Sequence, residues 1–393
     1  MNLRLRRIKT AFKFRVLNPL RYLYDEWLLA IQSNKEWQNT TYPTSSKPVR
    51  LLLLCDNGNY TSDQQFNVFQ KHRHKLRKKL RLISVNLLID DVQSLHKRLL
   101  TPFDIIGIKL SFNKSPSEAE RIVSSLSDMF PTQKIIYFDG DDDLCVQWPA
   151  LLKYVTTYIK KHVFSDRSEY QRSFVGKSNL TDYVHHLHGV SFSENMIPNT
   201  LPVPVEYQNK VILGYNIAMD AKIEELSDMT SNRSLETARP YDIACRASIP
   251  SDWTYQLRNV TPLLEGMKNR YQILAPVERV SQAKYYEEML FSKIYISPFG
   301  YGEICWRDFE AVLCGCLLIK PDMSHIKTNP DIFQAGITYI PIRWDFSDLE
   351  DKCAYYLDHE NERKQIVSNA RAVLTEFYNN EGIIKIIADI VCL

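Results

Sequence analysis

Long apolar runs are missing from this sequence. The best one covers residues 51–55, whereas a helix that crosses a bilayer needs about 20 apolar residues. The start of the chain also lacks the pattern of a secretory signal. We therefore expect a cytoplasmic protein that crosses no membrane and that contacts one only peripherally, on its inner face.

The cysteine spacing of zinc sites is missing too. The eight cysteines form no CxxC pair and no Cys/His arrangement of that kind. Cys314 and Cys316, the closest two, flank a glycine between apolar residues, which is typical of buried free thiols. We expect no bound metal.

The chain also lacks a large net charge. The chain carries +3 overall with 24% charged residues, which excludes an intrinsically disordered chain and gives no sign of a nucleic-acid partner. The charge is unevenly placed, however, with +12 over residues 1–100 and −9 over the rest. The two parts of the chain are therefore expected to face different partners.

Two short segments hold much of the basic charge. Residues 3–24 contain seven Lys and Arg side chains and no acidic one, interleaved with apolar residues. This pattern indicates a basic amphipathic helix on an anionic membrane surface, and an arm packed on its own domain or a transit peptide are the alternatives. Residues 71–81 form a second basic run, for which a solvated helix face is the simpler interpretation and contact with a membrane or an acceptor phosphate the other.

The length of 393 residues favours two domains. Short apolar runs alternate with helical patterns in two series, which predicts a parallel sheet in each domain. We expect a basic arm and linker at 1–48, a Rossmann-like domain at 49–208 and a second one at 209–393. The expected strands are 49–55, 105–110, 134–138 and 158–164 in the first domain, and 242–247, 271–275, 293–297, 316–320 and 338–342 in the second.

Residues 293–320 are the most informative segment, because they read as a strand, a glycine-containing turn, a helix and a buried strand. Gly300 and Gly302 allow close approach of a ligand. A helix starting at Glu303 would direct free N–H groups at a phosphate, so the turn is suited to a diphosphate.

The spacing of three charged residues adds to this. Glu303, Arg307 and Glu310 follow an i, i+4, i+7 pattern and are predicted to share one face of a helix over residues 303–314. A carboxylate can accept both hydroxyls of a ribose, and an arginine can hold a diphosphate. The alternative is a surface ion pair between Glu303 and Arg307.

The stretches SKIYISPFGYGE, RDFEA and CGCLLIKP at residues 292–303, 307–311 and 314–321 resemble GT-B glycosyltransferases, especially their spore-maturation (CgeB-like) branch. The resemblance implies two Rossmann-like domains facing a cleft, and transfer of a sugar from a nucleotide-sugar donor to a hydroxyl of a glycan or lipid-linked acceptor, in cell-surface glycan or polysaccharide synthesis. It implies no cofactor.

The same resemblance assigns roles to residues. It places Glu310 on the donor ribose and Arg307 beside it. The family's glutamate pair has one more residue between its members, so Gly302 takes the expected place of the first glutamate and the donor contact of Glu303 is displaced. Arg246 and Lys320 are expected near the diphosphate, with an ion pair to a nearby acid as the alternative for Arg246.

An acidic cluster follows the strand at 134–138. Residues 139–143 read Asp-Gly-Asp-Asp-Asp, and clustered carboxylates raise one another's pKa, which suits a general base. Asp139 and Asp141 are therefore the predicted catalytic residues; a divalent metal site and a solvated turn are the alternatives. The metal alternative corresponds to a GT-A-type transferase, and a non-catalytic coat protein with a glycosyltransferase fold is the remaining rival.

Overall fold

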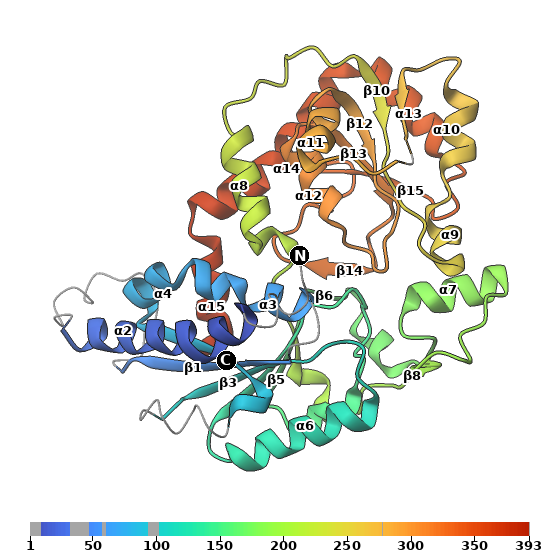
Figure 1. Cartoon of the computed structure of the whole chain (residues 1–393). Helices are drawn as coiled ribbons and strands as arrows, with labels where there is room; N and C mark the ends of the chain where they lie inside the picture. Colours follow the sequence, from blue (N-terminus) through green and yellow to red (C-terminus); the bar gives the residue numbers. More distant parts are fainter. Residues whose placement is uncertain (1–8, 32–46, 57–59, 93–101, 277, 393) are drawn as a thin grey trace.

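Two α/β domains, each built on a parallel sheet, make up the chain (Figure 1). The computed structural model describes residues 9–31, 47–56, 60–92, 102–276 and 278–392. The strand order is β2-β1-β3-β4-β5-β9 in the first sheet and β11-β10-β12-β13-β15 in the second. All pairings within these two sheets are parallel, which confirms the predicted fold class of two Rossmann-like domains.

The strands of the two domains and of two short antiparallel ribbons have the following bounds. The first sheet contains β1 (Val49–Cys55), β2 (Leu82–Leu88), β3 (Ile105–Lys109), β4 (Lys134–Asp139), β5 (Thr157–Lys160) and β9 (Val211–Leu213), and the second contains β10 (Tyr241–Ala244), β11 (Ile273–Leu274), β12 (Ser292–Ile296), β13 (Leu317–Pro321) and β15 (Ile340–Ile342). The ribbons are β6 (His162–Phe164) with β14 (Ile326–Thr328) and β7 (Phe174–Val175) with β8 (Asn199–Thr200).

Helices flank these sheets. They are α2 (Asn18–Ile31), α3 (Tyr60–Lys71), α4 (Arg73–Leu80), α6 (Pro116–Met129), α7 (Asn179–His188), α8 (Ala221–Thr230), α9 (Asp252–Arg258), α10 (Thr261–Met267), α11 (Gln282–Leu290), α12 (Trp306–Leu313), α13 (Leu349–Asp358), α14 (Glu360–Asn379) and α15 (Gly382–Cys392). Among the described residues, no helix combines the length and the apolar character that a bilayer span requires.

Strand β1 shows why an unbroken apolar run becomes a central strand. Its residues Leu51 to Leu54 are fully buried. Because successive side chains of a strand point to opposite faces, Leu52 and Leu54 pack in one core cluster and Leu51 and Leu53 in another. Both faces of the first sheet are thus covered, as expected for a parallel sheet.

The domain boundary lies later than predicted. Strand β9 pairs with β5, so residues beyond 208 still belong to the first sheet. The C-terminal helix α15 also returns to the first domain, where Ile383 and Ile387 share a core cluster with Leu76 and Leu80 of α4. Both ends of the predicted second domain, residues 209–393, therefore pack with the first domain.

The N-terminal segment packs on its own domain over the described part. A π-helical turn (Lys13–Leu17) leads into α2, which lies along β2. Phe14 and Tyr22 are buried, and the side-chain amide of Asn18 donates to the carbonyl of Asn86 at 2.8 Å. Residues 3–8 of the predicted basic helix and most of the predicted linker lie outside the described residues.

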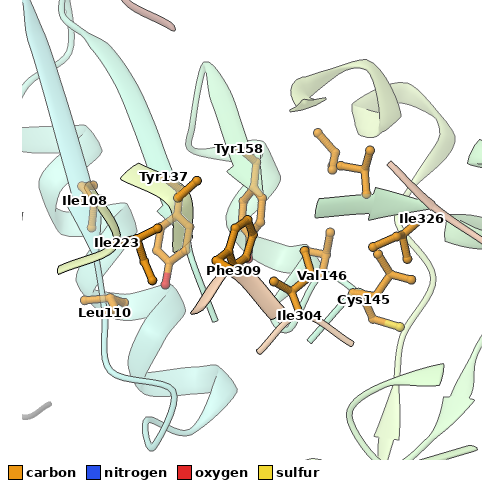
Figure 2. Close-up of a cluster of buried hydrophobic side chains, with 14 of the residues drawn as sticks. Ile108, Leu110, Tyr137, Cys145, Val146, Tyr158, Ile223, Ile304, Phe309 and Ile326 are labelled. Atoms are coloured by element: carbon orange, nitrogen blue, oxygen red, sulfur yellow. The ribbon is translucent and has the colours of Figure 1, made fainter. Parts of the chain in front are cut away.

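An apolar core joins the two domains (Figure 2). Ile304 and Phe309 of the second domain lie among Tyr158, Val146 and Cys145 of the first, all at most 2% exposed. The ribbon of β6 and β14 adds backbone pairing across the same boundary. The segment that precedes and forms α12 is therefore held by both domains at once.

Candidate active site

A cleft of about 570 Å³ opens between the two domains, a size within the range usual for small-molecule sites. From the first domain, Gly140, Asp142 and Lys161 line it. The second domain contributes the segment after β10, the turn after β12 and the first residues of α12. This is the cleft in which the sequence places the donor.

Helix α12 begins at Trp306, so the predicted helix start at Glu303 is wrong. Cys305 is the N-cap, and its N–H donates to the carboxylate of Asp308 at 2.8 Å. Glu303 lies before the helix and does not share a helical face with Arg307 and Glu310. Those two residues, about one turn apart on α12, both line the cleft.

Arg307 is fixed by the turn that precedes α12. Its Nε donates to the hydroxyl of Ser297 at 3.0 Å, and its Nη2 donates to the carbonyl of Pro298. The Ser297 hydroxyl in turn donates to Asp308, a buried carboxylate that pairs with Lys320 at 3.3 Å. Lys320 is fully buried and does not line the cleft, so its place in the structure is that of a counter-ion to Asp308.

A second arginine of the cleft, Arg258, was not found from the sequence. Only 6% of it is exposed, and it donates to the carbonyl oxygens of Phe299 at 2.9 Å and Ser248 at 2.6 Å. Burial and the positive charge of Arg307 lower the pKa of Arg258. Among the described residues, no carboxylate lies within ion-pair distance of Arg258 or Arg307.

Arg246 lines the cleft but has a carboxylate partner. Its guanidinium binds both oxygens of Glu288, with 2.9 Å between Nη2 and Oε1. The ion pair that was the alternative to a diphosphate contact is therefore formed. Gly300 also lines the cleft, and its N–H donates to the carbonyl of Gly302 at 2.8 Å.

Glu310 presents a carboxylate in a largely buried wall of the cleft. The hydroxyls of Tyr285 and Tyr286 donate to its two oxygens at 3.1 and 3.2 Å. Burial raises the pKa of Glu310, and the two tyrosine hydroxyls and Arg307 offset part of this effect. The residue is an acceptor of hydrogen bonds with room for further donors on the cleft side.

Glu303 is held away from the cleft. It is 1% exposed and accepts a hydrogen bond of 2.7 Å from the side-chain amide of Asn179. His162 and His325 lie 3.2 and 3.3 Å from its oxygens. Burial alone would raise the pKa of Glu303, but the two histidines hold it well below its usual value. Glu303 does not line the cleft, and its partners link the first domain to the second.

The acidic cluster at 139–143 does not act as a set of neighbouring carboxylates. Asp139 and Asp141 are buried beneath the cleft and do not line it. Burial would raise the pKa of Asp139, but Lys160 and Lys109 hold it below its usual value, whereas for Asp141 the burial effect prevails. Each aspartate has a lysine of its own: Asp139–Lys160 at 2.7 Å, Asp141–Lys109, Asp142–Lys161 at 2.6 Å and Asp143–Lys177 at 2.9 Å.

This pairing changes the interpretation of the cluster. The lysine partners offset part of the mutual repulsion on which the prediction of a base at Asp139 and Asp141 rested, although Asp139 still contributes to the raised pKa of Asp141. Within the described part of the chain, no group of three or more His, Cys, Asp or Glu residues is arranged to hold a metal ion. Asp142, whose side chain is 45% exposed, is the member of the cluster that lines the cleft.

Gly302 of the second domain lies close to the backbone of Asp142 in the first domain. A methyl group at this position would lie 2.0 Å from the carbonyl oxygen of Asp142. Gly302→Ala is therefore expected to lower the free energy of unfolding by about 1–3 kcal/mol, because backbone must move to admit the methyl group. Urea unfolding checks this against Gly266→Ala, where a methyl group meets nothing within 4 Å; equal stability of the two variants would contradict the close approach.

Comparison with known proteins gives a match over part of the chain. Residues 223–388 match the model of a family described as "Glycosyl transferase-like". The matched segment includes α12 and most of the second-domain wall of the cleft. No curated protein matches the chain.

Solved structures resemble the chain over most of its length at low sequence identity. HepE of Anabaena, solved in complex with UDP, is 11% identical with a TM-score of 0.47, over 88% of this chain and 100% of that one. An alpha-glucosyltransferase solved with UDP and a 13-mer DNA is 9% identical with a TM-score of 0.45, over 86% and 99%. A glycosyltransferase from Rickettsia africae is 12% identical with a TM-score of 0.44, over 87% and 99%.

Proposed function

We propose that this chain holds a nucleotide-sugar in the cleft between its domains and transfers the sugar to an acceptor hydroxyl. The match of residues 223–388 to the model described as "Glycosyl transferase-like" supports this. The family match agrees with the predicted superfamily and activity. The spore-maturation branch and a role in cell-surface glycan synthesis stay predictions.

The observation that carries the proposal is the pair Arg258 and Arg307. Both guanidiniums line the cleft, and neither has a carboxylate partner among the described residues. A largely buried positive charge without a counter-ion is unfavourable, and burial together with Arg307 lowers the pKa of Arg258 accordingly. Burial alone would lower the pKa of Arg307 too, but Cys305 and Asp308 raise it, so Arg258 gains most from a further negative charge.

A diphosphate supplies that counter-charge to Arg258 and Arg307, and arginine binds phosphate oxygens with two parallel hydrogen bonds. We therefore place the donor diphosphate at these two residues, with Arg246 and the turn at Gly300 beside it.

The remaining cleft residues complete the donor and acceptor sites. Glu310, one turn along α12 from Arg307, is the proposed acceptor of hydrogen bonds from the ribose hydroxyls. As the sugar leaves the diphosphate, negative charge grows on the departing phosphate, and the fixed arginines stabilise it. Asp142 is the carboxylate of the first domain that lines the cleft. Partial removal from solvent would raise the pKa of Asp142, but Lys161 and Lys177 hold it below its usual value. We therefore propose that the ionised carboxylate receives the acceptor hydroxyl.

A nucleotide panel tests the donor site. UDP, GDP, ADP, CMP and dTDP are added to the full chain, and the thermal unfolding midpoint is measured. A diphosphate at 100 times its Kd stabilises the folded state by about 2.7 kcal/mol. We expect one of the nucleoside diphosphates to raise the midpoint in wild type and in Arg121→Ala, an exposed arginine of α6, and to have no effect in Arg258→Ala. If no nucleotide shifts the wild type, the non-catalytic rival is favoured.

Metal removal distinguishes the proposal from the GT-A-type rival. In our proposal, arginines offset the charge of the leaving diphosphate, and each aspartate of residues 139–143 is already paired with a lysine. We expect the rate of transfer to be the same with and without EDTA. A loss of activity in EDTA that Mn²⁺ or Mg²⁺ restores would contradict the proposed arrangement.

Glu310→Gln tests the ribose contact. Glutamine keeps the size of the side chain but replaces one acceptor oxygen by a donor amide, and hydrogen bonds to charged groups contribute about 1.5–3 kcal/mol. We expect donor binding to weaken roughly 10- to 100-fold, and the preference for a ribonucleotide over its 2′-deoxy analogue to disappear. Glu278→Gln, which changes another carboxylate that lines the cleft, serves as the control, and an unchanged ribose preference in Glu310→Gln would refute the contact.

A further inference from the structure

The N-terminal helix of the first domain has two apolar sides. One side faces the domain, where Phe14, Tyr22 and Leu29 are buried in the core clusters. A helix on the surface of a domain normally carries polar residues on its other side. Here the other side is apolar as well.

The outward side forms a continuous exposed stripe, which we call the apolar stripe. Apart from the adjacent Leu23 and Tyr24, its members recur every three or four residues, the spacing that keeps side chains on one face of a helix. Tyr24 and Trp27 stack on one another with 5.8 Å between ring centroids. The members and their exposed fractions are Phe12 57%, Val16 40%, Leu20 59%, Leu23 45%, Tyr24 49% and Trp27 56%. Nothing in the described part of the chain covers the stripe, and Figure 1 shows α2 at the outer edge of the first domain.

The charges around the stripe are positive. Lys9, Lys13 and Arg21 lie on the same segment. Its two acidic residues are turned away into ion pairs: Asp25 with Arg77 of α4, and Glu26 with Arg50 at 2.7 Å. Of these charges, Lys9 and Arg21 are exposed and form no ion pair with another described residue. The outward face therefore combines apolar side chains with positive charge.

The second basic segment lies beside the first. The Asp25–Arg77 ion pair joins α2 to α4. Lys71 and Lys79 of the basic run are engaged by Glu224 at 2.6 Å and Glu381 at 2.9 Å. Lys75 and Lys78 are exposed and form no ion pair with any other described residue. The run is thus partly used within the fold and partly left as positive surface next to the stripe.

We infer that the apolar stripe inserts into the surface of an anionic phospholipid membrane. Apolar side chains of such a helix lie at the boundary between headgroups and acyl chains, aromatic rings such as Trp27 suit the headgroup level, and lysines and arginines bind anionic headgroups. A second copy of the chain fits this face less well, because a symmetric dimer would bring the same positive charges of both copies together.

Vesicle flotation of the full chain tests this inference. Vesicles of phosphatidylcholine alone are compared with vesicles that also contain phosphatidylglycerol. We expect binding to the anionic vesicles only. The double variant Leu20→Glu/Trp27→Glu is expected to bind at least tenfold more weakly, since each charge near the surface changes binding roughly fivefold. Met229→Glu changes a side chain of α8 that is 77% exposed, and it should bind as wild type does.

A charge variant provides an independent measurement. Lys9→Gln/Arg21→Gln keeps the apolar stripe and removes two exposed positive charges, so its affinity for anionic vesicles should fall by roughly fivefold for each charge. Thermal unfolding confirms that each variant is folded before flotation.

Three results would overturn the inference. They are a wild type that does not float with anionic vesicles, a folded Leu20→Glu/Trp27→Glu variant that floats as wild type does, and a wild-type dimer in analytical ultracentrifugation that the same variant converts to monomer. The last result would assign the stripe to a second copy of the chain.

Discussion

Arg307→Ala is expected to lower kcat/KM for sugar transfer by about two to three orders of magnitude. The guanidinium is held in place by Ser297 and Pro298 and faces the cleft without a carboxylate partner in the described chain. Removing it takes away a fixed positive charge at the point where negative charge develops on the leaving diphosphate. Initial rates at varied donor concentration measure the change.

The controls for this prediction separate charge from geometry. Arg307→Lys keeps a positive charge but cannot reproduce the two hydrogen bonds of the guanidinium together with a phosphate contact, so it should recover only part of the rate. Arg121→Ala should leave the rate unchanged. Wild-type kcat/KM in Arg307→Ala would remove the main support for the proposed donor site.

Lys160→Ala is expected to lower the free energy of unfolding by about 3–5 kcal/mol, because it leaves the Asp139 carboxylate buried without its counter-ion. Lys160 is 1% exposed, and its ammonium donates to Asp139 at 2.7 Å and to the carbonyl of Cys145 at 2.9 Å. Chemical unfolding measures the loss. Lys153→Ala, which removes an exposed ion pair with Glu120, should change stability by no more than about 1 kcal/mol.

The pH dependence of this loss identifies its cause. In the wild type, Lys160 and Lys109 hold the pKa of Asp139 below its usual value. This contributes stability above the pKa of the unfolded state, about 4, and the contribution is lost as the pH falls through the folded-state value. In Lys160→Ala a protonated Asp139 needs no counter-ion, so the difference from wild type should shrink below about pH 4. A difference that is constant with pH would point to lost packing instead.

Sequence reasoning located elements best where the signal was local. The run at 49–55 forms β1 with the predicted bounds, because a short unbroken apolar segment is best buried as a central strand. Strand β2 was missed, since Ser84 and Asn86 interrupt its apolar pattern. Asn86 can be buried because its polar groups form hydrogen bonds with residues far along the chain. Its carbonyl accepts a hydrogen bond from Asn18, and its side-chain oxygen accepts one from Cys55.

The candidate site shows the same limit. Arg307 and Glu310 could be found together because one helix carries both. Arg258 has no local motif, and only folding brings it beside Arg307. The lysines that pair with the acidic cluster come from other strands and loops, so the spacing of the aspartates alone could not predict these ion pairs. The predicted strand at 158–164 was split for a similar reason: after Lys160 the chain leaves the sheet, and β6 pairs with β14 of the other domain.

The apolar core between the domains has a consequence for how the donor binds. Domains joined by a small polar interface move relative to one another by default, whereas here Phe309 of α12 shares a buried apolar cluster with Tyr158 of the first domain (Figure 2). Helix α12 carries Arg307 and Glu310, so the residues proposed to bind the donor are already in position in the free protein. Little conformational entropy is then lost on binding. The free energy of the donor's interactions contributes to affinity and to transition-state stabilisation, because none of it is needed to close the protein around the donor.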